Sequence, residues 1–468
     1  MKIEQIYTGC LAQGAYYIES NGEVAIIDPL REVKPYMHRA EKAGAKIKYI
    51  FETHFHADFV SGHLTLAKQS GAQIVYGPTA NPSFDALIAE DNQVFKLGNI
   101  TITALHTPGH TMESTTYLLR DEAGKDHAIF TGDTLFLGDV GRPDLAQKAA
   151  SMTQEELAGT LFDSLRNKIM PLGDDVIVYP AHGAGSACGK NMMKETVDTL
   201  GNQKKMNYAL RENMTREEFI EEVTDGLMPP PQYFPLNVKM NKEGYEDIDA
   251  VIQRGTKGLS PDAFEAAANE TDAIVLDVRH QDDFVKGFVP RSIFIGIDGG
   301  FAPWVGALIA DVNQSILLVA PEGRLEETIT RLSRVGFDRT IGYLEGGIEA
   351  WKAAGKEVDT IESVTPDTYE AAYSSHPTFD VRKKGEFDAE HVEGASNTPL
   401  DYINDHLAEF PEQGKFYVHC AGGYRSVIAS SLLKSRGIHN IINVEGGMDA
   451  IQKLNIPTTD FSCPSEKK

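Results

Sequence analysis

The stretch Thr53-His54-Phe55-His56-Ala57-Asp58 directly follows Tyr49 to Glu52, a short run with the composition of a buried strand. Its two histidines and its aspartate stand at alternate positions beyond the strand, so their side chains can converge on one point. Imidazole nitrogens together with carboxylate oxygens suit zinc or iron, whereas carbonyls and waters suit calcium or magnesium. This stretch therefore predicts part of a transition-metal site at the end of a strand.

Polar residues occupy three later positions of the same kind. His110 stands in the tight turn Thr107 to Thr111, and Asp133 and His182 each stand just beyond an apolar run. Functional residues of α/β proteins gather at such strand ends. For any single one of the 14 histidines a surface or capping role is the simpler interpretation. Four such junctions in series favour one shared site.

Around these motifs, runs typical of strands alternate with runs typical of helices. The expected strands are Glu23–Asp28, Ile47–Glu52, Gln73–Tyr76, Ile100–Leu105, Thr115–Leu119, Ala128–Thr131 and Val176–Tyr179, and the expected helices are Val33–Ala43 and Val60–Gln69. Many short strands with fewer, longer helices indicate packed sheets covered by helices. The proline run Pro229 to Pro231 opens a polar stretch, and we expect a domain boundary between it and Gly258.

These motifs resemble those of the metallo-β-lactamase superfamily over about residues 1–240. The resemblance implies an αββα sandwich with a metal site at one edge of its sheets. Most hydrolytic members carry HxHxDH, whose last histidine helps to hold a second metal, and this chain has Phe59 there. That difference argues against a dinuclear zinc hydrolase. The runs Thr53 to Gly62 and Gly132 to Asp144 together resemble the persulfide dioxygenases.

The resemblance implies that His54, His110 and Asp133 hold one Fe(II), with coordination positions left open for substrate and oxygen. It implies further that three other polar residues orient the ligands and the bound persulfide: His56, Asp58 and His182. Spacing alone does not choose three ligands among the six. The expected reaction is RSSH + O₂ + H₂O → RSH + sulfite, with no organic cofactor.

The second half of the chain contains an internal repeat of about 100 residues. Asp277-Val278-Arg279 recurs as Asp380-Val381-Arg382, and Glu345-Gly346-Gly347 recurs as Glu445-Gly446-Gly447. Ser260 and Thr365, each followed by Pro-Asp, open the two copies as helix N-termini do. The repeat predicts two tandem, small, parallel-sheet α/β domains. We interpret the Asp and Arg of each Asp-Val-Arg motif as charges that hold the fold.

A cysteine ends a strand in the second copy. The run Tyr417 to Cys420 leads through Ala421, Gly422, Gly423, Tyr424 and Arg425 into a helix expected over Val427–Ser435. Backbone N–H groups of such a turn and a helix N-terminus favour a thiolate, and Arg425 adds a positive charge. A buried structural cysteine is the alternative, and the glycine-rich loop argues against it. Four residues separate Cys420 from Arg425, which makes a ring suited to a single sulfur atom.

This pattern resembles the rhodanese sulfurtransferases over about residues 361–460. The resemblance implies that Cys420 carries sulfane sulfur as a persulfide, with Ala421, Gly422, Gly423 and Tyr424 forming the loop around it. The first copy has Ala320 and Leu325 at the positions of Cys420 and Arg425. It resembles an inactive rhodanese module, a spacer or a docking surface.

The sequence therefore predicts an α/β multidomain chain, in which an αββα metallo-β-lactamase-like sandwich is followed by two small parallel-sheet α/β rhodanese-like domains. The expected domains are a persulfide dioxygenase domain over 1–245, a rhodanese-like domain without the catalytic cysteine over 256–358, and a rhodanese domain with Cys420 over 361–460. In this scheme the two ends of the chain share sulfane sulfur as their substrate.

Composition bounds the setting of this chemistry. The 468 residues carry a net charge of −24, which argues against binding to nucleic acid or to an anionic membrane. The four cysteines form no CxxC pair, the first residues lack the apolar core of a signal peptide, and no apolar run approaches 18 residues. We expect a cytoplasmic protein with reduced thiols, and a homo-oligomer, either a dimer or a tetramer.

Several points stay open at the level of sequence. The thiol carrier could be glutathione, coenzyme A, bacillithiol or another small thiol, and sulfur could pass from persulfide to sulfite or from thiosulfate to a thiol. Arg142 is either a contact for an anionic carrier or part of a surface salt bridge. Cys188 either touches the persulfide near the metal or fills the core. Two other functions are considered, a zinc thioester hydrolase of the glyoxalase II kind and a non-catalytic sulfur sensor or scaffold.

Overall fold

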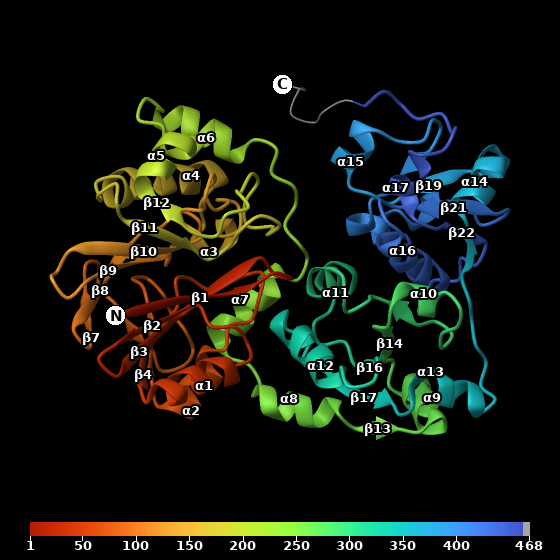
Figure 1. Ribbon diagram of the computed structural model, residues 1–468, viewed down its shortest axis with the longest axis horizontal. Helices are drawn as coiled ribbons and strands as arrows, with labels where there is room; N and C mark the ends of the chain where they lie inside the picture. The colour runs from red at the N-terminus through yellow and green to blue at the C-terminus, as the bar shows by residue number, and fades with distance from the viewer. Residues whose placement is uncertain (462–468) are drawn as a thin grey trace. The chain divides into compact units, whose positions relative to one another are not determined.

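The computed structural model describes residues 1–461, which form two units (Figure 1). The first unit comprises Met1–Ile248 with the short segment Ser333–Gly336, and the second comprises the rest of the chain from Asp249. Within residues 1–461, no helix combines the length and the apolar composition needed to cross a membrane. The expected domain limits 1–245, 256–358 and 361–460 stay predictions.

Two mixed six-stranded sheets form the centre of the first unit. The first sheet contains, in spatial order, β1 (Lys2–Thr8), β2 (Gln13–Ser20), β3 (Glu23–Ile27), β4 (Lys46–Phe51), β5 (Gln73–Tyr76) and β6 (Leu87–Ile88). The second contains β12 (Asp198–Thr199), β11 (Ile177–Pro180), β10 (Asp126–Gly132), β9 (Thr115–Arg120), β8 (Ile100–His106) and β7 (Val94–Leu97). The strands expected from sequence are confirmed, with ends that differ by one or two residues.

Alternation of side chains along the strands explains why the sheets stack. In β2, Tyr16 and Ile18 enter the core between the two sheets, whereas Ala15 and Tyr17 enter the core on the outer face. Strand β10 does the same, since Phe130 faces the other sheet and Ile129 faces the helices. Residues of opposite parity therefore bury both faces of each sheet.

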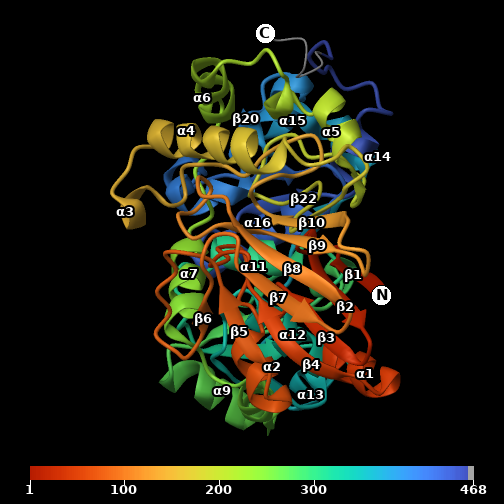
Figure 2. The same ribbon diagram turned by 90° about the vertical axis from the view of Figure 1, so that its left-hand side faces the viewer.

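Helices cover the two outer faces, which completes an αββα sandwich (Figure 2). The helices of this unit are α1 (Lys34–Ala43), α2 (His63–Ser70), α3 (Gln147–Ala150), α4 (Gln154–Ser164), α5 (Leu200–Met206), α6 (Arg216–Thr224) and α7 (Phe234–Glu243), and α8 (Ile248–Gly255) follows. Helix α1 ends at Gly44 with φ of 62°, a left-handed conformation that favours glycine, as the sequence predicted.

Helix α2 begins at His63, three residues later than the sequence predicted. The expected first turn is instead a buried loop. In it, the hydroxyl oxygen of Ser61 lies 2.9 Å from the carbonyl oxygen of Pro29 and 2.6 Å from Oε1 of Glu52, and its amide donates to Asn241 Oδ1. These contacts with other segments replace the intrahelical bonds that Val60 and its neighbours would have made.

The second unit contains two five-stranded parallel sheets with the same strand order. The first has β13 (Gly258–Leu259), β17 (Thr340–Leu344), β16 (Ile316–Val319), β14 (Ile274–Asp277) and β15 (Ile293–Phe294), with α9 (Pro261–Glu270), α10 (Gln281–Phe284), α11 (Phe301–Leu308), α12 (Leu325–Arg334) and α13 (Gly347–Ala353). The second has β18 (Glu362–Val364), β22 (Ile441–Val444), β21 (Phe416–His419), β19 (Thr378–Asp380) and β20 (Ser396–Asn397), with α14 (Pro366–Ala372), α15 (Lys384–Ala389), α16 (Tyr424–Ser435) and α17 (Gly447–Ile451). The predicted tandem repeat is confirmed.

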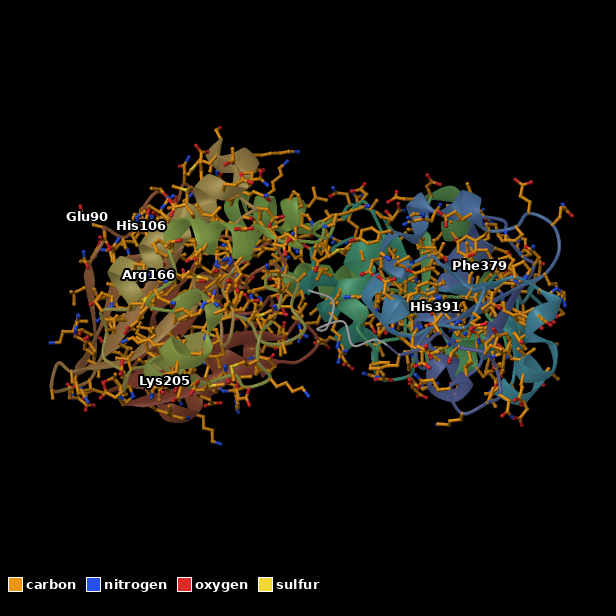
Figure 3. The ribbon with its side chains drawn as sticks, turned by 90° about the horizontal axis from the view of Figure 1, so that it is seen from above. Glu90, His106, Arg166, Lys205, Phe379 and His391 are labelled. Atoms are coloured by element: carbon orange, nitrogen blue, oxygen red, sulfur yellow. The ribbon has the colours of Figure 1, made fainter. Side chains whose placement is uncertain are left out.

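Matching local interactions stabilise the two copies. The hydroxyls of Ser260 and Thr365 accept hydrogen bonds from backbone amides in the first turns of α9 and α14, as helix N-caps do. In the second copy, the ring centroid of Phe379 lies 4.7 Å from that of Phe410 and 5.3 Å from that of Phe416. Figure 3 labels Phe379.

A buried ion pair follows the second strand of each copy. Arg279 donates to both oxygens of Asp277, and Arg382 donates to both oxygens of Asp380. Each guanidinium also donates to a carbonyl ahead in the chain, that of Gly287 or Glu390 respectively. These pairs hold the loops after β14 and β19, as the sequence analysis proposed for both motifs.

We predict that Asp380→Ala destabilises the last domain by about 3 kcal/mol, because it leaves the buried Arg382 without its carboxylate. Hydrogen exchange of the full chain, measured on peptides that contain β21, would report this as lost protection. The control is Lys384→Ala, which breaks an exposed ion pair with Asp388 and should cost less than about 1 kcal/mol. Equal protection in the two variants would contradict the assignment.

Candidate metal centre and cysteine loop

Loops that follow β4, β8 and β10 bring His54, His110 and Asp133 together in the first unit. We call these three residues the metal cluster. Oδ2 of Asp133 lies 3.8 Å from Nε2 of His54 and 3.5 Å from Nε2 of His110. All three side chains are at most 2% exposed. Of the six residues expected at the site, these are the three that the resemblance selected as ligands.

Hydrogen bonds on the far side of each imidazole fix its orientation. Nδ1 of His110 donates to the carbonyl of Arg142 at 2.8 Å, so Nε2 keeps its lone pair for a cation. Nδ1 of His54 lies 3.0 Å from the hydroxyl of Thr53, which donates to Oδ2 of Asp28. The chain Asp28–Thr53–His54 thereby turns Nε2 of His54 toward Asp133.

The two carboxylate oxygens of Asp133 differ in their hydrogen bonding. Oδ1 accepts a hydrogen bond from Nδ1 of His182 at 2.8 Å, whereas Oδ2 is buried and has no hydrogen-bond partner among the described residues 1–461. An unpaired buried carboxylate oxygen between two imidazole nitrogens is costly without a cation. The donor set of two nitrogens and one oxygen therefore fits a transition-metal ion.

The protonation states of the metal cluster also fit a cation. Burial and the neighbouring His56 lower the pKa of His54 well below its ordinary value, so its ring is neutral at pH 7. Burial alone would raise the pKa of Asp133, but His182 and His54 outweigh it and hold that pKa below its usual range. Neutral imidazoles and an ionised carboxylate are the forms that bind metals.

A second group of buried ligating residues adjoins the metal cluster. Asp58, His182 and Cys188 have ligand atoms within 4.8 Å of one another, and Nε2 of His182 lies 2.8 Å from Oδ2 of Asp58. Burial raises the pKa of the Cys188 thiol, and the carboxylates of Asp58 and Asp133 raise it further. Of the two roles considered for Cys188, this geometry supports a place beside the metal site.

The ring of His56 packs against that of His54, with centroids 4.2 Å apart, while its Nε2 points to other carboxylates than that of Asp133. Its Nε2 lies 3.0 Å from Oδ1 of Asp28 and 3.7 Å from Oε2 of Glu52, and its ring centroid lies 4.3 Å from that of Phe59. Burial and the charge of Asp28 raise the pKa of Glu52 well above its ordinary value, which favours a proton on Glu52. His56 thus contacts the residues that support His54.

The guanidinium of Arg142 makes several hydrogen bonds within the protein. It donates to both oxygens of Asp144 at 2.7 Å and to the carbonyls of Ala187 and Met228. Its backbone carbonyl holds His110, and its backbone amide donates to the carbonyl of Cys188. Of the two roles left open for Arg142, these contacts favour the salt bridge, which is buried instead of lying on the surface.

Some residues near the metal cluster escaped the sequence analysis. Asp28 and Glu52 directly follow β3 and β4, so the same rule of polar residues at strand ends could have found them. Asn241 and Tyr233 could not be found this way, because Asn241 lies within α7 and Tyr233 directly precedes this helix. Asn241 donates to the carbonyls of His56 and Phe59, and burial together with the charges of Asp58 and Cys188 raises the pKa of Tyr233.

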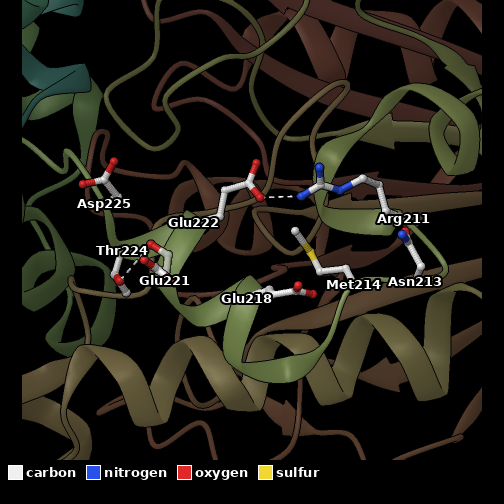
Figure 4. A pocket seen from close by; sticks show the side chains of 8 residues that line it. All are labelled: Arg211, Asn213, Met214, Glu218, Glu221, Glu222, Thr224 and Asp225. Atoms are coloured by element: carbon white, nitrogen blue, oxygen red, sulfur yellow. Dashed lines mark hydrogen bonds and ion pairs between the residues drawn. The ribbon is translucent and has the colours of Figure 1, made fainter. Parts of the chain in front are cut away.

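A cavity of about 760 Å³ lies elsewhere in the first unit, beside α6 (Figure 4). Acidic side chains dominate its lining, and one of them, Glu222, forms an ion pair with Arg211. None of the residues of the metal cluster lines it. This acidic cavity is therefore distinct from the metal cluster.

In the second unit, Cys420 stands at the turn between β21 and α16. We call Cys420 and the four residues that follow it, up to Tyr424, the cysteine loop. The sulfur of Cys420 accepts a hydrogen bond from the amide of Gly423 at 3.1 Å and lies 3.7 Å from the hydroxyl of Ser426. Gly423 has φ of 102°, a left-handed conformation that glycine adopts without strain. The amide and the N-terminus of α16 both favour negative charge on the sulfur.

Residues that follow the motif Glu445-Gly446-Gly447 also form hydrogen bonds with the loop that contains Cys420. The amides of Met448 and Asp449, in the first turn of α17, donate to the carbonyls of Cys420 and Ala421. A side chain at Gly447 would come within 2.3 Å of the carbonyl oxygen of Cys420. A Cβ at the equivalent Gly347 would meet nothing within 4 Å, so the first copy lacks this close approach.

Arg425 does not present a free charge to the sulfur. Its guanidinium donates to both oxygens of Glu386, at 2.6 and 2.8 Å, and this pairing raises the pKa of Arg425 and lowers that of Glu386. The residue therefore ties α15 to the start of α16. In the first copy, Ala320 follows β16, and the nearby Arg324 pairs with Asp298 and Glu327.

Comparisons with known proteins agree with this architecture. The model of the metallo-β-lactamase superfamily matches residues 8–182, and that of the rhodanese-like domain matches residues 260–354 and 365–454. The human mitochondrial persulfide dioxygenase ETHE1 is 29% identical over 221 residues, which are 47% of this chain and 78% of that protein. The hydroxyacylglutathione hydrolase GloC of Haemophilus influenzae is 27% identical over 213 residues, 41% of this chain and 94% of that protein.

A solved structure extends the match into the second unit. The crystal structure of a metallo-β-lactamase from Staphylococcus aureus is 30% identical, with a TM-score of 0.65, and the match covers 74% of this chain and 98% of that chain. The two mixed sheets lie in the part of the chain that the metallo-β-lactamase model matches, and the two parallel sheets lie in the parts that the rhodanese-like model matches. The chain therefore belongs to the metallo-β-lactamase superfamily and consists of a domain of that fold followed by two rhodanese-like domains.

Proposed function

We propose that the first unit is an iron-dependent persulfide dioxygenase and that Cys420 transfers sulfane sulfur between small carriers. The overall reaction of the first unit is RSSH + O₂ + H₂O → RSH + SO₃²⁻ + 2H⁺. The observation that carries this proposal is the metal cluster itself, in which two imidazoles, of which that of His54 is neutral, and one ionised carboxylate meet at a buried point. The cysteine loop in the same chain supports sulfur as the shared substrate.

An Fe(II) ion bound by His54, His110 and Asp133 would retain open coordination positions and supply the redox chemistry that O₂ requires. The protein's own task is to hold this donor set. The N–H at Nδ1 of His110 donates to the carbonyl of Arg142, and Nδ1 of His182 donates to Oδ1 of Asp133, so that Oδ2 faces the imidazoles. Asp58 holds the other nitrogen of His182 in turn.

The walls of the site suit a small sulfur compound. Phe59 and Phe136 are fully buried beside His56 and His182, which limits bulk water near the reacting sulfur. Cys188 and Tyr233 lie on the side of Asp58, where a thiol and a phenol can contact the persulfide. The carrier itself, whether glutathione, coenzyme A, bacillithiol or another thiol, stays open.

The proposed transfer at Cys420 has two balanced steps. With thiosulfate as donor, Cys420–S⁻ + S₂O₃²⁻ → Cys420–S–S⁻ + SO₃²⁻ breaks the sulfur–sulfur bond of thiosulfate and forms one on the enzyme. A thiolate then takes the terminal sulfur, Cys420–S–S⁻ + RS⁻ → Cys420–S⁻ + RSS⁻. Each step is reversible in form, so the domain either supplies persulfide to the first unit or consumes its sulfite.

One observation favours a second candidate function, a zinc thioester hydrolase. Cys188 lies close to Asp58 and His182, so these residues offer three donors for a second cation although Phe59 replaces the usual histidine. The similarity to a hydroxyacylglutathione hydrolase is of the same order as the similarity to a persulfide dioxygenase. Two zinc ions per chain and hydrolysis of S-lactoylglutathione would support this alternative.

We predict that Asp133→Asn lowers bound iron from about one ion per chain to below about 0.1, because an amide replaces the only anionic ligand. Mass spectrometry of the metal content after anaerobic loading measures this directly. His127→Gln, which removes a histidine outside the metal cluster, should leave iron binding unchanged. Stoichiometric iron in the Asp133→Asn protein would show that the ligand set is wrong.

The dioxygenase proposal predicts that iron-loaded protein given glutathione persulfide consumes O₂ and releases one sulfite per O₂. Oxygen uptake and sulfite are measured in parallel, with coenzyme A persulfide as a second substrate and zinc-loaded protein as the control. Removal of iron by a chelator should abolish both signals, and added Fe(II) should restore them. Iron-loaded protein that consumes no oxygen with either persulfide would refute the proposal.

The two activities should separate by mutation. Cys420→Ser is expected to reduce the formation of thiocyanate from thiosulfate and cyanide by at least about 10³-fold, because a hydroxyl cannot carry a sulfane sulfur as a persulfide. Oxygen uptake with glutathione persulfide should persist in this variant. Ser435→Ala, at the far end of α16, is the matched control. Unchanged sulfur transfer in Cys420→Ser would eliminate this residue as the carrier.

A further inference from the structure

A cavity of about 310 Å³ in the second unit is lined by residues of both rhodanese-like domains. Gly422 and Gly423 of the cysteine loop form part of its wall. The inactive domain contributes Lys286 and its neighbours in and after α10, and the active domain contributes Asn443 and Glu445. The domain without a nucleophile therefore forms one side of a cavity next to the loop that has one.

Specific contacts hold the two domains together at this place. The hydroxyl of Tyr424, in the cysteine loop, donates to the carbonyl of Gly296 at 2.7 Å. A side chain at Gly299 would come within 2.3 Å of the Tyr424 ring, so the glycine permits this close packing. Ser431 of α16 accepts a hydrogen bond from the amide of Phe294 at 2.9 Å. These contacts fix the cavity walls relative to each other.

One polar atom of the lining lacks a partner. Asn443 is 3% exposed, and its amide nitrogen donates to the hydroxyl of Ser363. Its carbonyl oxygen, Oδ1, is buried and has no hydrogen-bond partner within the described chain. Such a group costs free energy unless a donor reaches it. A ligand with an N–H group would satisfy this oxygen.

Two opposite charges complete the lining. Lys286 and Glu445 are exposed, and neither forms an ion pair within residues 1–461, with each other or with another residue. Asp282 adds a further carboxylate, which lies 3.5 Å from His280. A polyanion such as a nucleoside phosphate would meet these acidic groups, whereas a ligand that carries both charges would match Lys286 and Glu445.

We propose that this cavity binds the thiol that exchanges sulfur with Cys420, and that this thiol carries an α-amino-acid group. Lys286 pairs with its carboxylate, and Glu445 together with Oδ1 of Asn443 accepts hydrogen bonds from its ammonium. The inactive domain then serves as a wall of the carrier site. The inference rests on the proposed sulfur transfer at Cys420, and it names the class of the carrier and one specificity-determining lysine.

The test uses three thiols as acceptors of sulfur from thiosulfate in the full-length protein. L-Cysteine has both charges, cysteamine lacks the carboxylate, and N-acetylcysteine lacks the ammonium. We expect the wild type to have a kcat/KM for L-cysteine about tenfold higher than for either analogue, because each lost charge removes one charged hydrogen bond.

Variants assign each charge to a residue. Lys286→Ala should abolish the preference for L-cysteine over cysteamine while the preference over N-acetylcysteine persists, and Glu445→Gln should do the reverse. Lys257→Ala, which removes another exposed lysine of the same domain, should keep both preferences. Both residues under test are exposed, so folding is not at risk, and a structural role alone would not move the two preferences separately.

Cyanide carries neither an ammonium nor a carboxylate, so it tests the sulfur transfer at Cys420 separately from the proposed carrier site. Thiocyanate formation without any preference among the three thiols would overturn the carrier site and leave the sulfur transfer standing. Loss of both preferences together in Lys286→Ala would likewise overturn the assignment of the carboxylate to this lysine. Wild-type protein that forms no thiocyanate would refute the proposed function of Cys420 itself.

Discussion

The buried carboxylate of Asp133 is the interaction around which the first unit is organised. A charge in this position is tolerated only because His182 holds one oxygen and because the two imidazoles of the metal cluster face the other. Strands from both sheets end at this point, and each delivers one polar residue past a hydrophobic core. The supporting chain through Thr53 and Asp28, and the carbonyl of Arg142, then fix the ring orientations.

Close backbone approach is the corresponding constraint in the second unit. Gly447 lets the first turn of α17 reach the carbonyls of Cys420 and Ala421, and the amide of Gly423 then points at the sulfur. The same strand order in the first copy lacks both the cysteine and this approach at Gly347. One copy of the repeated fold thus contains the cysteine, while Gly296 and Gly299 of the other copy contact Tyr424.

Local sequence signals predicted the fold and the strand-end residues well. A polar residue after an apolar strand is visible in the sequence, and this signal identified four site residues: His54, His110, Asp133 and His182. Tyr233 and Asn241 were not, since they reach the site from a helix whose packing depends on long-range contacts. The distant carbonyls that Arg142 contacts and the partner Glu386 of Arg425 were equally out of reach, because such long-range hydrogen bonds leave no periodic trace.

Under the proposed function, one iron ion occupies the site between His54, His110 and Asp133. Anomalous diffraction at the iron and zinc absorption edges, on crystals of protein purified without added metal, can locate and identify this ion. We expect a single peak per chain at this position, present above the iron edge and bound by these three side chains. Zinc at this position, or a second metal between Asp58, His182 and Cys188, would contradict it.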